Sequence, residues 1–247
     1  EHQSKGAEVM IALDVSNSML ARDYSPNRLE RAKLAISRLV DKLNGDRVGL
    51  VLFAGTSFVQ LPITTDYVSA KMFLGNISTE SIPVQGTAIG DAINTCIRSF
   101  SAQSEKSRAI IVITDGENHE DDPVAAAKQA ADMGIMVYTI GVGSQQGQPI
   151  PMKNGLLKDS EGNIVVTKLD ENTLEEVAKA GNGAYVHAGN DEFGLNPVIN
   201  DIRKLDEEEF KSIVEQFMYF FAIALGLLVI QMLIGERKVL RHLFDKR

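Results

Sequence analysis

The chain has 247 residues, of which 44% are hydrophobic and 23% are charged, and its formal net charge is -8. This length and composition are those of one large α/β domain or two small ones, and they exclude a disordered chain, a collagen-like repeat and a small disulfide-rich scaffold. The acidic balance argues against a general affinity for nucleic acid, and the single cysteine, Cys96, excludes an intrachain disulfide.

Apolar runs alternate with amphipathic helical patterns through the first half of the chain. Residues 9–13 and 48–53 are continuously apolar, as buried parallel strands are. Residues 57–63 contain Pro62 and predict an edge strand, because proline is poorly tolerated inside a sheet. Helices are expected from Ser25-Pro26, with serine as the N-cap, and then over 66–74 and 88–100.

The same alternation continues through the second half. Strands are predicted over 109–114, 135–142 and 185–188, with a helix capped by Asp122 and another capped by Asn172 between them. Strands that alternate with helices predict an α/β fold, a doubly wound and mostly parallel sheet with helices on both faces.

We expect this fold to be one domain over residues 8–200. Turn signals interrupt the alternation near 145–168 and predict an inserted hairpin. Residues 1–7 are interpreted as an N-terminal remnant. Since the chain starts at Glu1 and no export signal precedes the first strand, we expect the native chain to be longer.

The C-terminal segment differs from the domain in its hydropathy. Residues 217–234 carry no charge and would span about 27 Å as a helix, which predicts one transmembrane helix. Residues 201–216 are expected to form a juxtamembrane helix. Residues 235–247 are basic and, by the positive-inside rule, cytoplasmic, which places the domain on the other side of the membrane.

Three polar segments fall at strand ends or helix starts. They are Asp14-Val-Ser16-Asn-Ser18, Gly86-Thr87 and Thr114-Asp115. In a doubly wound sheet the carboxyl ends of the strands share one edge, so these segments are expected to meet there. Two carboxylates placed together repel each other unless one is protonated or a cation lies between them. An all-oxygen site of modest charge favours Mg²⁺, with Mn²⁺ or Ca²⁺ as alternatives.

These residues resemble the metal-ion-dependent adhesion site of von Willebrand factor A domains, in which D-x-S-x-S is followed by a threonine and an aspartate. The resemblance implies that the hydroxyls bind the metal directly, that the aspartates act largely through water, and that a partner's Asp or Glu completes the coordination. The implied metal site is Asp14, Ser16, Ser18, Thr87 and Asp115.

A narrower resemblance is to the Bat-type aerotolerance proteins of bacteria. It is carried by residues 27–33, the inserted hairpin and the segment 236–238 after the apolar run. It implies a periplasmic domain on the inner membrane, with a single C-terminal anchor in this chain and its C-terminus in the cytoplasm. Other membrane-bound A-domain proteins, MoxR-type ATPases and a role in stress or oxygen tolerance are implied as the setting.

Residues around the predicted metal form a candidate partner-binding rim: Asn17, Glu117 and His119. The acidic run after Asp115 has two interpretations. It is either a solvated loop or a rim that selects partners with basic residues around their acidic side chain.

We therefore predict a membrane-anchored protein-binding module and not an enzyme. His119 could be a catalytic base, but no nucleophile motif accompanies it. Two alternatives stay open. One is a Mg²⁺-dependent phosphatase-like hydrolase using Asp14, although Ser16 stands where such enzymes commonly have a second acid. The other is a scaffold with a vestigial metal site.

Overall fold

The structure is a computed structural model, and it describes residues 6–43, 45–101, 104, 106–118, 120–189, 192–204, 218–221 and 223. The chain divides into two compact units, Glu1–Lys204 and Leu205–Arg247. The first unit holds every strand and every predicted site residue that the structure describes.

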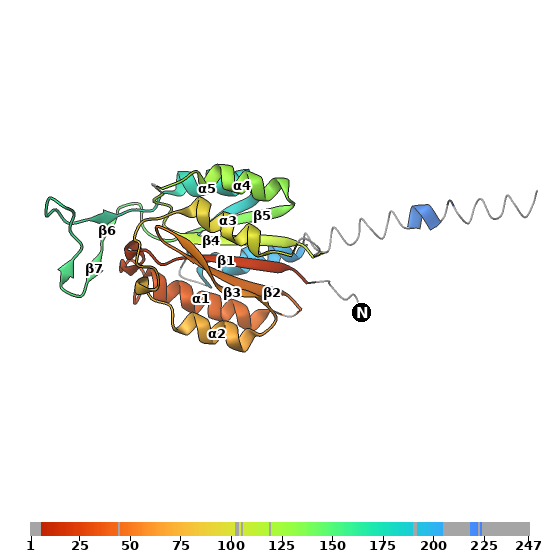
Figure 1. The fold of residues 1–247 in the computed structure, drawn as a ribbon, viewed down its shortest axis with the longest axis horizontal. Helices are drawn as coiled ribbons and strands as arrows, with labels where there is room; N and C mark the ends of the chain where they lie inside the picture. Colours follow the sequence, from red (N-terminus) through yellow and green to blue (C-terminus); the bar gives the residue numbers. More distant parts are fainter. Residues whose placement is uncertain are drawn as a thin grey trace, which may run out of the picture. The chain divides into compact units, whose positions relative to one another are not determined.

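A six-stranded sheet forms the centre of the first unit (Figure 1). Its strands, in spatial order, are β10 (Asn182–His187), β5 (Ile135–Gly141), β4 (Arg108–Thr114), β1 (Glu8–Asp14), β2 (Arg47–Phe53) and β3 (Ser57–Thr64). All neighbours pair in parallel except β2 and β3, which are antiparallel. The sheet is therefore mostly parallel, as predicted, and the strand that contains Pro62 is at its edge.

Helices cover both faces of the sheet (Figure 1). One face packs against α1 (Arg28–Lys42), α2 (Tyr67–Gly75) and the helical residues 195–204, and the other against α3 (Ile89–Ser99), α4 (Pro123–Asp132) and α5 (Glu171–Ala180). Side chains of β1 alternate between the two faces: Ile11 and Leu13 face one, and Met10 and Ala12 the other. A strand buried on both faces must be apolar throughout, which explains the continuous apolar runs.

Two helix starts differ from the sequence prediction. Helix α1 begins at Arg28 with Asn27 as its N-cap, not at Ser25-Pro26, because the Asn27 side chain accepts from the Glu30 N–H. Helix α5 is capped by Asp170 and not by Asn172. The Asp170 side chain accepts from the Thr173 N–H, and its own N–H donates to the Asp115 carbonyl at 2.8 Å, so the start of this helix is joined to the site.

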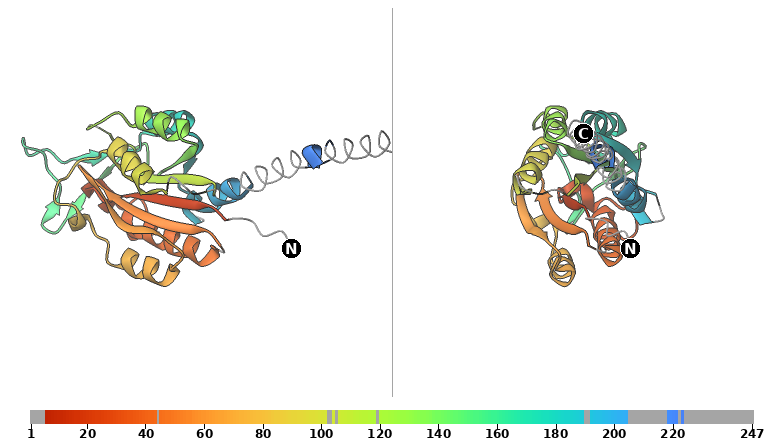
Figure 2. Two further views of the ribbon diagram at one scale, coloured as in Figure 1. Left: turned by 45° about the vertical axis from the view of Figure 1, so that its right-hand side comes forward. Right: turned by 90° about the vertical axis from the view of Figure 1, so that its right-hand side faces the viewer.

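The segment between β5 and α5 forms an arm of short antiparallel pairs. Strand β6 (Gln148–Pro149) pairs with β9 (Val166–Thr167), and β7 (Pro151–Met152) pairs with β8 (Gly155–Leu156). The arm projects from the end of the sheet at which β1 finishes (Figures 1 and 2). It lies in the region predicted to hold an inserted hairpin.

The predicted transmembrane helix at 217–234 falls outside the described residues except for 218–221 and 223, and the basic tail falls outside them entirely. Among the residues that are described, no helix has the length and hydrophobicity needed to cross a bilayer.

Candidate metal centre

Asp14 and Asp115 follow adjacent strands at the same edge of the sheet. Asp14 is the last residue of β1, and Asp115 comes directly after β4, which pairs with β1 in parallel. Both side chains are fully buried. The Thr114 hydroxyl donates to Asp14 Oδ2 at 2.6 Å and so ties the two strand ends together. The parallel sheet thus brings together two carboxylates that are about one hundred residues apart in sequence.

The serines of the first segment lie beside these carboxylates. Asp14 Oδ1 accepts from the Ser16 N–H at 2.8 Å, which bends the chain immediately after β1. Ser16 then precedes a short 3₁₀ helix, η1 (Asn17–Leu20), but its side chain makes no capping bond. Instead the Ser16 and Ser18 hydroxyls lie 2.9 Å apart. Ser18 also hydrogen-bonds Asp115, so its hydroxyl connects the two segments.

A fully buried arginine contacts the site from α1. Arg28 Nη1 lies 3.0 Å from Asp115 Oδ2, and Nη2 lies 2.7 Å from Asp23 Oδ2. Thr167, in the arm, donates to the same Asp115 oxygen at 2.9 Å. The planar guanidinium presents its N–H donors in a fixed geometry and contacts both aspartates through different nitrogens. Asp115 is therefore held in place by α1 and by the arm.

The electrostatics of the pair follow from burial. Loss of hydration and the nearby Asp115 carboxylate raise the pKa of Asp14 from its usual 3.8 to about 7. Burial also raises the pKa of Asp115, while the Ser18 hydrogen bond and the Arg28 charge act in the opposite direction. Without a cation, the site therefore favours a proton on Asp14 near neutral pH.

The residues present fit a divalent cation. A cation would offset both the burial and the repulsion by Asp115 that raise the pKa of Asp14, and hydroxyl and carboxylate oxygens are the ligands that Mg²⁺ and Mn²⁺ use. Within the described part of the chain, no group of three or more His, Cys, Asp or Glu side chains is arranged to hold a metal. A cation at this edge would therefore depend on hydroxyls and water as well as on the two aspartates.

Thr87 belongs to the segment just before α3, which comes to the same edge of the sheet. It is mostly buried and lies just before α3, where the Ala88 N–H donates to the Ala54 carbonyl at 2.8 Å, beyond the end of β2. The Asn17 N–H donates to Gln85 Oε1 at 3.0 Å, which joins the segment before α3 to the serine segment. Thr87 does not cap α3, because the residue at the N-cap position is Ala88.

The candidate rim residues differ in their surroundings. Asn17 is half-buried and lines a cavity beside the site. Glu117 Oε1 accepts from the Lys168 N–H at 2.9 Å, so this carboxylate is engaged by the arm. His119 lies outside the described residues.

Two members of the acidic run have structural roles: the cap formed by Asp122 was predicted from the sequence, whereas the role of Asp121 was not. The Asp121 carboxylate accepts from the N–H groups of Gly90 and Asp91 at 3.0 and 2.7 Å, in the first turn of α3. Asp122 caps α4 by accepting from the Ala125 N–H. Both interactions satisfy backbone donors at helix N-termini, so this part of the run is neither simply solvated nor free to contact a partner.

Sequence reasoning missed Arg28 and Thr167 as neighbours of the site, and it gave no separate role to Thr114, which it placed in the third polar segment. Arg28 precedes the apolar face of a helix and has the pattern of an exposed first-turn residue. Thr114 directly precedes Asp115, so its place at the strand end was the one available signal.

The strand order and the polar residues at this edge of the sheet indicate the class of protein to which the chain belongs. The model of the von Willebrand factor type A domain matches residues 8–192, and the chain belongs to this family. Solved structures that are only 20% identical share the fold, among them proximal thread matrix protein 1 of the mussel byssus, with a TM-score of 0.58.

Within the family, two solved structures are much more similar. An aerotolerance-related membrane protein from Bacteroides fragilis is 54% identical with a TM-score of 0.78, and the match covers 81% of this chain and 100% of that one. BatB from Bacteroides thetaiotaomicron is 53% identical with a TM-score of 0.76, over 84% and 100% of the two chains. These similarities place the chain among the Bat-type aerotolerance-related proteins.

Curated relatives are longer than this chain. A UPF0353 protein of Nocardia farcinica is 32% identical in an alignment of 201 positions that covers 74% of this chain and 58% of that protein. An uncharacterized protein of Borreliella burgdorferi is 28% identical over 243 residues, which are 95% of this chain and 70% of that protein. The chain thus spans little more than half the length of the UPF0353 relative.

Proposed function

We propose that this domain binds a divalent cation and uses it to hold an acidic side chain of a partner protein. The residues that would hold the cation are Asp14, Ser16, Ser18, Thr87 and Asp115. The observation that carries the proposal is the buried pair of Asp14 and Asp115, with the Ser16 and Ser18 hydroxyls bonded to each other and Ser18 bonded to Asp115.

The chemistry of these side chains favours binding of a carboxylate. A bound cation supplies a positive charge that neutral hydroxyls and water leave largely uncompensated. Arg28 and Thr167 engage Oδ2 of Asp115, and Thr114 engages Oδ2 of Asp14, so each aspartate is held in one orientation by the protein. Because Asp115 is already paired with Arg28, the two aspartates balance only part of the charge of the cation, and the remainder attracts an acidic partner.

Cation binding is tested by calorimetry of the full chain in detergent. We expect Mg²⁺ or Mn²⁺ to bind with a stoichiometry of one, and we expect Asp14→Ala to lose that binding. Ca²⁺ and Zn²⁺ belong in the same series, the latter because a form of the mussel protein is described with a zinc-occupied site. Absence of binding by any of the four would favour a scaffold with a vestigial site.

The partner is tested by affinity capture with and without chelator. We expect at least one partner to need both the cation and Asp14. Other membrane-bound A-domain proteins and a MoxR-type ATPase are the partners that the Bat-type family favours. The hydrolase alternative predicts a different result, namely metal-dependent release of phosphate from a phosphomonoester that is lost in Asp14→Ala.

The proposed setting is the bacterial inner membrane, with residues 217–234 as the anchor and the domain in the periplasm. The Bacteroides fragilis relative is named a membrane protein, which supports membrane association. Fractionation tests this setting, because truncation after Lys204 should release the protein from membranes. A full-length chain found in the soluble fraction would contradict the proposed anchor.

A further inference from the structure

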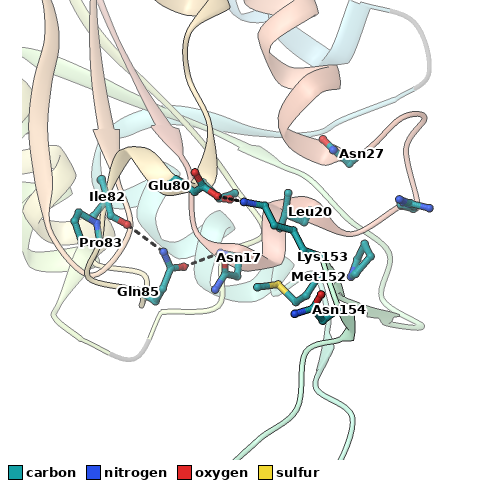
Figure 3. Close-up of a pocket in the computed structure, with 13 residues that line it drawn as sticks. Asn17, Leu20, Asn27, Glu80, Ile82, Pro83, Gln85, Met152, Lys153 and Asn154 are labelled. Carbon is teal, nitrogen blue, oxygen red and sulfur yellow. Dashed lines mark hydrogen bonds and ion pairs between the residues drawn. The ribbon is translucent and has the colours of Figure 1, made fainter.

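A cavity of about 730 Å³ opens beside the serine segment of the candidate metal centre. Its walls come from η1, from residues 79–85, which include the short helix η2 (Thr79–Ser81), and from the β7–β8 hairpin of the arm (Figure 3). We call this cavity the arm groove. Its volume is within the range of sites that enclose a ligand or a short segment of chain.

The groove adjoins the segment that carries the serines of the candidate metal centre. Asn17, which lines it, stands between Ser16 and Ser18 in the chain. Gln85 accepts from the Asn17 N–H and donates through Nε2 to the Ile82 carbonyl at 3.1 Å (Figure 3). A ligand in the groove would therefore lie against two of the segments that carry the metal-site residues.

The outer wall of the groove combines an ion pair with apolar surface. Lys153 Nζ of the arm lies 2.7 Å from Glu80 Oε1 of η2 (Figure 3). Next to Lys153, Met152 exposes 39% of its surface, and other apolar side chains of the arm are also exposed: Leu156, Ile164 and Val166. Exposed apolar side chains that gather on a projecting arm are typical of a surface that a partner covers.

The charge of the groove is positive. Lys153 and Glu80 neutralise each other. Arg22 also lines the groove, is exposed, and makes no hydrogen bond or ion pair with any residue in the described part of the chain. An uncompensated guanidinium near a cation site complements a ligand with more than one carboxylate.

We infer that the arm groove binds an extended acidic segment of a protein partner. One carboxylate of that segment binds the cation, an apolar side chain packs against Met152, and a second carboxylate pairs with Arg22. This inference rests on the proposed cation site and adds to it the second acid and the apolar contact, which set the specificity for the partner.

Selection from a displayed library tests the inference. The probe is a library of eight-residue peptides with one fixed aspartate, selected on the full chain in detergent with Mg²⁺. We expect the enriched peptides to carry a second acidic residue and an apolar residue, and to be released by chelator. The selected peptide should bind Arg22→Glu about tenfold more weakly, since reversing a charge that contacts the ligand costs at least about 1.4 kcal/mol.

Matched variants separate the groove from general charge and surface effects. Arg38→Glu makes the same charge change on an exposed position of α1, and Met133→Ser matches Met152→Ser at an exposed methionine after α4. We expect both controls to bind the peptide as the wild type does, and we expect Met152→Ser to bind the peptide more weakly.

The outcomes distinguish the two proposals. Calorimetry with Mg²⁺ on the same variants should give wild-type binding for Arg22→Glu and Met152→Ser. If the wild type binds no cation, the metal proposal fails. If it binds the cation but the library yields no enriched peptide, or peptides that bind Arg22→Glu and Met152→Ser unchanged, then the groove is not the binding surface.

Discussion

Arg28 Nη1 lies 3.0 Å from Asp115 Oδ2, and both side chains are fully buried. The same guanidinium pairs with Asp23, and its Nη1 donates to the Thr167 hydroxyl oxygen at 3.2 Å. One side chain therefore connects the start of α1, the end of β4 and the root of the arm. This network places a permanent positive charge beside one aspartate of the candidate site and leaves the other without one.

Replacing the buried Arg28 should destabilise the fold more than replacing an exposed arginine does. We expect Arg28→Met to lower the free energy of unfolding by about 3–5 kcal/mol in chelator, because it leaves a buried carboxylate without its partner. Saturating Mg²⁺ should restore part of the loss, since the cation provides a second source of positive charge. Urea unfolding with and without Mg²⁺ measures both effects. Arg38→Met, on an exposed position of the same helix, is the control, and an equal loss in that variant would contradict the prediction.

The raised pKa of Asp14 predicts an unusual pH dependence of stability without metal. The folded-state pKa is about 7 and the ordinary value is 3.8, so folding takes up a proton between these pH values. The contribution of Asp14 is therefore fully present below the lower value and is lost as the pH rises toward 7, by at most about 1.4 kcal/mol per pH unit. Unfolding of the wild type and of Asp14→Asn in chelator from pH 4 to 8 isolates this contribution as their difference. A difference that does not change with pH would contradict it.

Cation affinity should depend on pH in the opposite direction. The cation competes with the proton on Asp14, so the affinity for Mg²⁺ should rise by about tenfold per pH unit below pH 7 and become constant above it. Calorimetry in buffers of different ionisation enthalpy would detect the released proton. An affinity that is the same at pH 6 and pH 8 would show that Asp14 is already ionised in the metal-free protein.

Removing the serine hydroxyls should weaken cation binding and have little effect on the stability of the fold. We expect Ser16→Ala and Ser18→Ala each to lower the affinity for Mg²⁺ by about tenfold. This equals about 1.4 kcal/mol, which is typical of one lost polar contact. Their stability in chelator should change by no more than about 1 kcal/mol, because Asp14 keeps the hydrogen bond from Thr114 and Asp115 keeps those from Arg28 and Thr167. Ser160→Ala, exposed in the arm, is the matched control.

Asp121 is expected to act through α3. Asp121→Ala removes the acceptor of the Gly90 and Asp91 N–H groups and should cost about 1 kcal/mol of stability. Glu120→Gln, the exposed neighbour, should leave stability unchanged. Thermal unfolding compares the two. If Asp121→Ala were as stable as Glu120→Gln, the carboxylate would be available for a partner, as the rim interpretation of the acidic run requires.

Much of the fold could be predicted because its signals are local. Buried parallel strands are apolar throughout, and residues 9–13 and 48–53 show this pattern. Edge strands tolerate proline, and residues 57–63 contain one. Helix starts were less accurate. Asp170 caps α5 through the Thr173 N–H, and its backbone also bonds to Asp115; the sequence offered both Asp170 and Asn172 as local caps, and only the second contact is distant in sequence.

The candidate site, too, could be predicted from the sequence only in part. The order of Asp14, Ser16, Ser18, Thr87 and Asp115 is a property of the chain, and oxygen-bearing residues at strand ends are sufficient to predict that they gather at one edge. Only the tertiary structure shows that Arg28 is buried against Asp115, that Glu117 is engaged by Lys168, and that the arm borders a groove beside Asn17. The physical reason is that strand and helix periodicities are set by neighbours in sequence, whereas burial and charge pairing are set by neighbours in space.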